Sequence, residues 1–159
     1  MKIFNRFTKT AFFTFLIMSV VFVACKNDDD NTTTPVDTNP IVGKWQLTSV
    51  VPETAGTTIP ALTLLPALGC VYELKFTFTG DNKVALSDCD AAVTLLGSYL
   101  QIQSTTTWKV ETGKLTLTNG STSNTFGLVQ NTNDMQIIVN TNTTGTGAAV
   151  NAVMSLKRL

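Results

Sequence analysis

Carboxylates are the side chains of this chain best suited by type to acid–base chemistry. Asp88 and Asp90 lie close together, and Glu73 and Glu111 fall in segments expected to be strands. A pair of carboxyl groups held about 5–9 Å apart across a cleft can hydrolyse a glycosidic bond. Alternation of apolar residues places Glu73 on the outer face of its strand, and Asp88 and Asp90 flank a cysteine at a strand end. We therefore interpret all four as solvated surface acids.

Histidine is absent from all 159 residues of the chain. This removes the commonest general base, the Ser-His and Cys-His nucleophile pairs and imidazole metal ligands. The sequence contains no nucleophile elbow, phosphate-binding loop or Cys-x-x-Cys motif. Its formal net charge is zero, so no strong field points to a nucleic acid. These features predict a protein that is not an enzyme and that holds no metal or cofactor.

The cysteines carry the remaining chemistry of the sequence. Cys25 ends an apolar run, residues 11–24, which follows a segment with three lysine or arginine residues. A bilayer-spanning helix needs about 20 apolar residues. The shorter run therefore predicts a cleaved signal peptide, and an uncleaved N-terminal anchor is the alternative.

The sequence Phe-Val-Ala-Cys at residues 22–25 resembles the lipobox of bacterial lipoproteins. In that motif an apolar residue, a spacer and a small residue precede the cysteine. The resemblance implies that the Cys25 thiol carries a diacylglycerol and that its freed amine carries a further chain. At about 0.8 kcal/mol per buried methylene, two or more acyl chains anchor a protein firmly. The alternative is a coincidental cysteine at the end of a leader.

The residues after Cys25, Lys-Asn-Asp-Asp-Asp, resemble the acidic signal that sends some Gram-negative lipoproteins to the outer face of the outer membrane. This predicts a lipid-anchored protein on the cell surface, with the periplasmic face as the alternative. Residues 27–40 contain two prolines and almost no apolar side chain, so they cannot bury enough surface to fold. We expect a signal peptide at 1–24, a lipidated cysteine and flexible acidic tether at 25–40, and one folded domain at 41–159.

Period-two alternation in short runs dominates the domain and is typical of antiparallel strands. In the clearest run, residues 71–80, one face carries Tyr72, Leu74, Phe76 and Phe78. Eight such runs in about 120 residues predict an up-and-down barrel, which leaves no free sheet edge. A β-sandwich fits the alternation equally well and is the alternative. The other seven runs are residues 43–51, 83–88, 106–110, 114–118, 124–130, 134–141 and 149–159.

Two stretches do not fit this alternation. Residues 52–69 carry three prolines and several leucines. A segment of this length is either functional or disordered, and the leucines favour one that covers the barrel end as a mobile lid or as a plug. Residues 91–103 fit an extra strand or a short helix.

Gly43-Lys44-Trp45 opens the first expected strand and resembles the Gly-x-Trp signature of lipocalins. The resemblance implies that Trp45 closes the barrel floor and that Arg158, near the end of the last strand, packs across its ring. A cation over an indole face contributes about 0.5–2 kcal/mol. The lipobox, the acidic tether, the two later cysteines and a Phe-Thr-x-x-Gly-Asp-Asn hairpin make the layout similar to small lipocalin-like domains of bacterial surface lipoproteins.

Cys70 and Cys89 remain once Cys25 is assigned to the anchor. Exported compartments are oxidising, so this pair predicts a disulfide, with two free buried thiols as the alternative. A cross-link that closes a loop of about 20 residues contributes roughly 3 kcal/mol to stability. The two cysteines are out of phase in the expected strands, so the bridge requires a bulge or strands that end before the cysteines.

Two functions fit a barrel of this kind. In the first, the barrel holds a small apolar ligand; in the second, its own side chains fill it, and its loops or outer face meet another envelope protein or a glycan. A cavity of about 300 Å³ or more, open near residues 52–69, favours the ligand binder, and a closed core favours the interaction module. The side chains expected to line such a cavity are Trp45, Leu47, Tyr72, Leu74, Phe76, Trp108, Phe126 and Met154.

Overall fold

The computed structural model of the chain describes residues 39–142 and 147–159, which belong to one compact unit. The predicted signal peptide, Cys25 and nearly all of the predicted tether lie outside the described residues. Within the described residues, none of the helices has both the length and the apolar character needed to cross a membrane.

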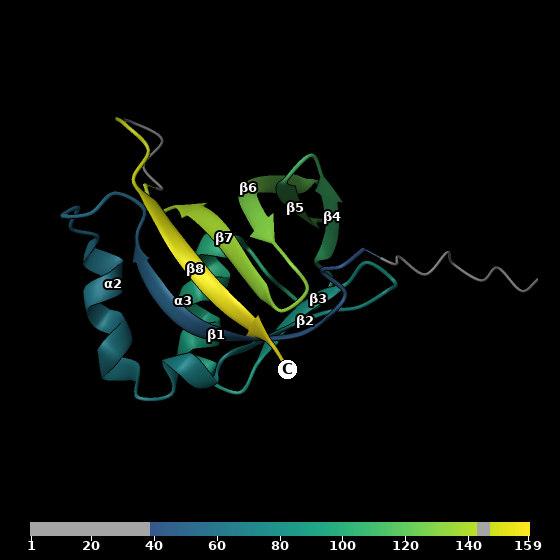
Figure 1. The fold of residues 1–159 in the computed structure, drawn as a ribbon, viewed down its shortest axis with the longest axis horizontal. Coiled ribbons are helices and arrows are strands. Elements are labelled where there is room, and N and C mark those ends of the chain that lie inside the picture. Colours follow the sequence, from purple (N-terminus) through teal and green to yellow (C-terminus); the bar gives the residue numbers. More distant parts are fainter. Residues whose placement is uncertain (1–38, 143–146) are drawn as a thin grey trace, which may run out of the picture. The chain divides into compact units, whose positions relative to one another are not determined.

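Eight antiparallel strands form a nearly closed barrel, as the alternation predicts (Figure 1). Their order in the sheet is β3-β2-β1-β8-β7-β6-β5-β4, so the first strand pairs with the last. Every other neighbouring pair is consecutive along the chain. The up-and-down barrel is therefore confirmed and the β-sandwich is not. The strands are β1 (Gly43–Pro52), β2 (Lys75–Phe78), β3 (Val84–Ser87), β4 (Thr107–Glu111), β5 (Lys114–Asn119), β6 (Thr122–Gln130), β7 (Asp134–Asn140) and β8 (Asn151–Arg158).

The two outermost strands of the sheet, β3 and β4, meet at one end. Lys83 and Thr107 form an isolated antiparallel bridge, and the Trp108 N–H donates to the Asn82 carbonyl at 2.8 Å. This contact closes the wall there and covers part of two edges that would otherwise invite pairing with another chain.

The segment that fitted a strand or a helix forms helix α3 (Asp90–Leu100) between β3 and β4. Ala92, Leu96 and Leu100 follow one another at intervals of four and are all buried. Residues four apart share one face of a helix, so α3 packs this face against the core. The helix ends at Leu100, and the next residue, Gln101, adopts the left-handed conformation common at helix C-termini.

Residues 53–69, defined here as the covering segment, fold into helix α2 (Pro60–Leu64) and the 3-10 helix η1 (Leu65–Leu68). Pro60 occupies the first turn, where its missing N–H has no intrahelical partner to lose. Ile59 and Leu65 are buried. Ile59 and Leu65 therefore anchor the helical part of the covering segment on apolar residues, whereas residues 53–56 between β1 and this part are exposed (Figure 1).

The expectation that Tyr72 points inward is wrong, because 48% of this residue is exposed. Residues Val71–Glu73 form a 3-10 helix, η2, and β2 begins only at Lys75. A 3-10 helix has three residues per turn, so period-two alternation does not extend back to Tyr72. Within β2 the alternation holds, and Phe76 and Phe78 are buried.

The alternation of Trp45, Leu47 and Val51 along residues 43–51 predicts that Val51 faces inward, but a bulge in β1 reverses its orientation. The register of β1 against β8 shifts between Leu47 and Ser49, which leaves Thr48 as an extra residue. One extra residue moves the inward face by one position. Val50 therefore faces inward toward the helices, and Val51 is 49% exposed.

The bulge predicts opposite responses of Val50 and Val51 to the same substitution. Val50→Thr should lower the free energy of unfolding by about 1–2 kcal/mol, because a hydroxyl replaces an inward methyl group. Val51→Thr keeps the β-branch on an exposed face and should change it by less than about 0.5 kcal/mol. Urea unfolding followed by circular dichroism measures both values. Equal losses, or a larger loss at Val51, would contradict the register of β1.

Candidate functional site

One tryptophan holds the end of the barrel at which the described chain begins, called here the closed end. Trp45 is fully buried, and its indole N–H donates to the Ile41 carbonyl at 2.7 Å. The guanidinium carbon of Arg158 lies 4.2 Å from the centroid of the Trp45 ring. This is the stacking that the Gly-x-Trp resemblance implied, in a geometry favourable for a cation over an indole face.

Arg158 also binds three separate backbone carbonyls. Its Nε donates to Thr132 at 2.6 Å, its Nη1 donates to Val42 at 2.9 Å, and its Nη2 donates to Pro40. These carbonyls belong to the β6–β7 turn and to the chain just before β1. The planar guanidinium presents five donors in a fixed fork, so one side chain joins three segments at the closed end.

Gly43 is required by the position of Arg158. A Cβ atom built on Gly43 would lie 2.5 Å from Nη1 of Arg158, and the φ angle of Gly43 is +139°. Glycine alone adopts such a conformation at little cost. The Gly-Lys-Trp motif thus combines a glycine that admits the arginine with the tryptophan on which the arginine stacks.

The interior of the barrel is filled by its own side chains. The rings of Phe78 and Trp108 meet edge to face, with their centroids 6.0 Å apart, and the Trp108 indole N–H donates to the Thr79 carbonyl at 3.2 Å. Tyr72 is exposed on η2. Six other side chains that were expected to line a cavity belong to this hydrophobic core, each at most 7% exposed: Trp45, Leu47, Leu74, Phe76, Trp108 and Phe126.

A narrow crevice lies between the covering segment, α3 and the inner face of β1, β7 and β8. Its volume is about 20 Å³, which is room for roughly one water molecule. Met154 is the one predicted cavity residue that lines it. Tyr99 is the one lining residue whose side chain carries a polar group. The lining residues are Val50, Ala61, Leu62, Leu65, Leu95, Leu96, Tyr99, Leu100, Val139, Ala152 and Met154.

A family model described as a lipocalin-like domain matches residues 41–144, more than half of the chain. The chain belongs to this lipocalin-like domain family. No curated protein and no solved structure matches the chain significantly. The match ends before β8, so Arg158 and its contact with Trp45 come from the structure and not from the family model.

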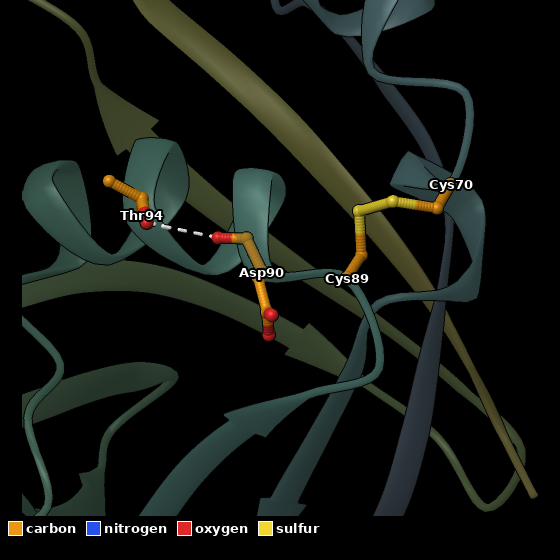
Figure 2. Close-up of a disulfide and its surroundings, with 4 residues drawn as sticks. All are labelled: Cys70, Cys89, Asp90 and Thr94. Atoms are coloured by element: carbon orange, nitrogen blue, oxygen red, sulfur yellow. Dashed lines mark hydrogen bonds between the residues drawn. A yellow bond between two sulfur atoms is a disulfide. The ribbon is translucent and has the colours of Figure 1, made fainter.

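The lipocalin-like barrel carries the predicted disulfide. Cys70 and Cys89 are bonded, with their Cα atoms 5.7 Å apart (Figure 2). Cys70 precedes η2, and Cys89 is the residue before the first turn of α3. Both cysteines therefore lie outside the strands. This removes the conflict of phase, because two residues must share a face only within paired strands.

The acids considered for catalysis do not meet in the crevice of the lipocalin-like barrel. Asp88 lies in the turn before α3, where its carboxylate accepts a hydrogen bond from Ser87 at 2.5 Å and lies 3.4 Å from the Lys75 ammonium. The Ser87 hydrogen bond, followed by the nearby Lys75, holds the pKa of Asp88 below its usual value. The other three acids are exposed on different elements: Glu73, Asp90 and Glu111.

Metal-binding side chains do not gather in the described part of the chain. In residues 39–142 and 147–159 no group of three or more His, Cys, Asp or Glu side chains is placed to hold a metal ion.

The crevice was not predicted from the sequence because α3 forms one of its walls. The alternation of apolar residues did not decide whether residues 91–103 form a strand or a helix. The spacing of Ala92, Leu96 and Leu100 is a helical signal that could have identified this wall. The bulge in β1 is a second reason, because it turns Val50 instead of Val51 toward the crevice and no pattern in the sequence indicates it.

The contact at the closed end predicts that Gly43→Ala is more costly than Gly120→Ala. Both glycines have a positive φ angle, but nothing lies within 4 Å of a Cβ atom on Gly120. Gly120→Ala should therefore cost only the conformational term, about 1–2 kcal/mol. Gly43→Ala should cost at least about 1 kcal/mol more, because it displaces Arg158 and its hydrogen bonds.

The measurement is the free energy of unfolding of both variants, alone and combined with Arg158→Met. Removing the guanidinium should lower the cost of Gly43→Ala by about 1 kcal/mol or more and leave the backbone cost of its φ angle of +139°, whereas the cost of Gly120→Ala should not change. A cost of Gly43→Ala that is the same with and without the Arg158 guanidinium would contradict the assigned role of Gly43.

Proposed function

We propose that this lipocalin-like domain binds an apolar molecule at the crevice between the covering segment and α3. The observation that carries the proposal is the chemistry of the crevice wall, which is apolar except for the Tyr99 phenol. The wall is built from two helical segments and three strands. Binding sites for small apolar molecules are lined in this way, with few polar groups that orient the ligand.

The crevice is too small to bind an organic ligand as it stands. Its volume is about 20 Å³, whereas a site for such a ligand needs about 300 Å³ or more. Binding therefore requires the covering segment to move away from α3. Helix α2 has one turn and none of its five residues is fully buried. Gly56 and Gly69 bound the helical part of the segment, have positive φ angles and have space around them. Movement of this segment costs less than opening the filled barrel.

The second candidate function is an interaction module with a filled interior. The observation that favours it is the small crevice volume, together with an interior occupied by buried aromatic side chains such as Trp45, Phe76 and Trp108. In this case the loops or the outer face of the barrel meet another envelope protein or a glycan, and no small molecule is bound.

The proposal also covers where in the cell the protein is found. Cys25 carries the lipid anchor, the acidic residues after it direct the protein to the outer membrane, and the domain stands on the cell surface or, alternatively, at the periplasmic face. The lipobox-like sequence and the acidic run support this location. The partners proposed are therefore the membrane, through the anchor, and an apolar ligand.

Catalysis is not part of the proposed function. The crevice lining includes no carboxylate, amine or thiol in the described part of the chain, and Tyr99 is its one hydroxyl. A tyrosine without a partner base or acid at the site favours orienting a ligand over transforming it.

The ligand proposal predicts that Leu62→Glu, but not Leu64→Glu, abolishes binding. Both residues lie in α2; Leu62 lines the crevice, whereas Leu64 is 57% exposed. A carboxylate at residue 62 would have to be desolvated by any apolar ligand. The mature protein, extracted from membranes, is examined by native mass spectrometry for a co-purifying small molecule and is photolabelled with a long-chain alkyl diazirine.

Labelled peptides from α2 and α3 in the wild type and in Leu64→Glu, at least about tenfold above Leu62→Glu, would support the proposal. If the wild type carries no small molecule and labels no more than Leu62→Glu with the Cys70–Cys89 bond either formed or reduced, the ligand proposal fails and the filled interaction module stands.

The anchor predicts that Cys25→Ala changes the mass and the location of the protein. The wild type should carry acyl chains on an N-terminal cysteine, and the variant should lose the lipid and the cleavage that follows it. Intact-mass measurement separates lipidation from retention by an uncleaved leader. A Cys25→Ala protein that is cleaved normally and still partitions with membranes would refute the anchor.

A further inference from the structure

The disulfide joins the two walls of the crevice. Cys70 directly follows the covering segment, which supplies Leu62 and Leu65 to one wall. Cys89 directly precedes α3, which supplies Leu96 to the other wall. One covalent bond therefore fixes the separation of the two walls at the end where the cysteines lie (Figure 2).

Hydrogen bonds from the covering segment to a strand lie at its first residue, where the Glu53 N–H donates to the Asn151 carbonyl at 2.9 Å and the Glu53 carboxylate accepts from the Asn151 side-chain amide at 2.7 Å. Within α2, the Leu62 N–H donates to the Ile59 carbonyl at 3.0 Å and the Leu65 N–H donates to the Leu62 carbonyl, so these bonds are local. Ile59 and Leu65 are buried, and Leu62 and Leu68 are partly buried against the core. At Gly69, next to Cys70, the φ angle is +66° and nothing lies within 4 Å of a built Cβ atom. This junction can swing once the bond that follows it is broken.

We propose that the redox state of Cys70 and Cys89 regulates the crevice. The disulfide holds the covering segment against α3 and keeps the crevice narrow; the dithiol form lets the segment separate from α3 and admits an apolar molecule. The admission of a molecule rests on the proposed function, whereas the separation of the walls does not.

The chemistry is thiol–disulfide exchange with a dithiol reductant. Its thiolate attacks the sulfur of Cys70, which is half-buried, whereas Cys89 is only 4% exposed. The S–S bond breaks, its electron pair leaves on Cys89, and that thiolate takes a proton from water. The second thiol of the reductant then displaces Cys70, so the reductant leaves as a disulfide and both cysteines become thiols.

Cys89 is the better leaving group because of its place at α3. It is the N-cap of an 11-residue helix and no side chain caps that end, so the helix N-terminus stabilises a thiolate there. Two carboxylates flank it and act in the opposite direction. Asp88 is paired with Lys75 at 3.4 Å, and the Asp90 side chain points away from the disulfide (Figure 2).

The test is amide hydrogen exchange of the mature, membrane-extracted protein, measured by mass spectrometry. It compares the oxidised protein, the protein reduced with dithiothreitol, and the Cys70→Ser/Cys89→Ser variant. Reduction should speed exchange at Leu62 and Leu65 by about tenfold or more and leave the amides of β7 and β8 unchanged. Unchanged exchange at these leucines would overturn the inference. So would equal acceleration in β7 and β8, because the bond would then only stabilise the whole fold.

The alkyl diazirine separates this inference from the proposed function. Labelling of α2 and α3 that increases on reduction, and is lost in Leu62→Glu, supports both. Faster exchange with no labelling in either redox state refutes the ligand and leaves the disulfide in control of the segment. Labelling that is equal in the two redox states refutes the regulation and leaves the ligand.

Discussion

The pairing of β1 with β8, sealed where Arg158 stacks on Trp45, is the constraint on which the rest of the barrel depends. The junction between β1 and β8 divides the sheet into a group of three strands, β1 to β3, and a group of five, β4 to β8. The second junction between these groups, at β3 and β4, has one isolated bridge. Loss of the β1–β8 pair would therefore separate the sheet into two open pieces with long unpaired edges. The carbonyls bound by Arg158 hold the chain before β1 and the β6–β7 turn to the same point.

A lipocalin-like fold does not by itself provide a cavity. An eight-stranded barrel is just wide enough for side chains to fill or for one small ligand. Here the inward positions carry large side chains, and Phe76, Phe78 and Trp108 occupy the interior. The apolar crevice lies where the inner face of β1, β7 and β8 meets α3 and the covering segment, whose helices the strand pattern does not describe. Function therefore has to be argued from this crevice and not from the fold.

Alternation along the sequence was sufficient for the eight strands and for most inward residues, because a half-buried strand must repeat every two residues. It failed where the backbone departs from that repeat: at Tyr72 in a 3-10 helix and at Val51 after a bulge. It did not predict α3 as a helix, because a short apolar run fits both the period of a strand and the period of a helix. The contact between Trp45 and Arg158 was predicted from the resemblance to lipocalins. The Cys70–Cys89 disulfide was predicted from the oxidising compartment that the expected signal peptide implied. Whether inward residues enclose a void depends on the sum of their volumes in three dimensions, which no pattern along the chain contains.

The seal between the first and last strands also sets the order of events when the chain is made. The hydrogen bond from Arg158 to Val42 joins residues 116 positions apart. A chain that emerges with its N-terminus first cannot complete this bond until its final residues arrive. Until then β1 has a bare edge on the side reserved for β8, and such an edge can pair with a neighbouring chain. The barrel therefore closes late, and it stays incomplete until β8 has been synthesised.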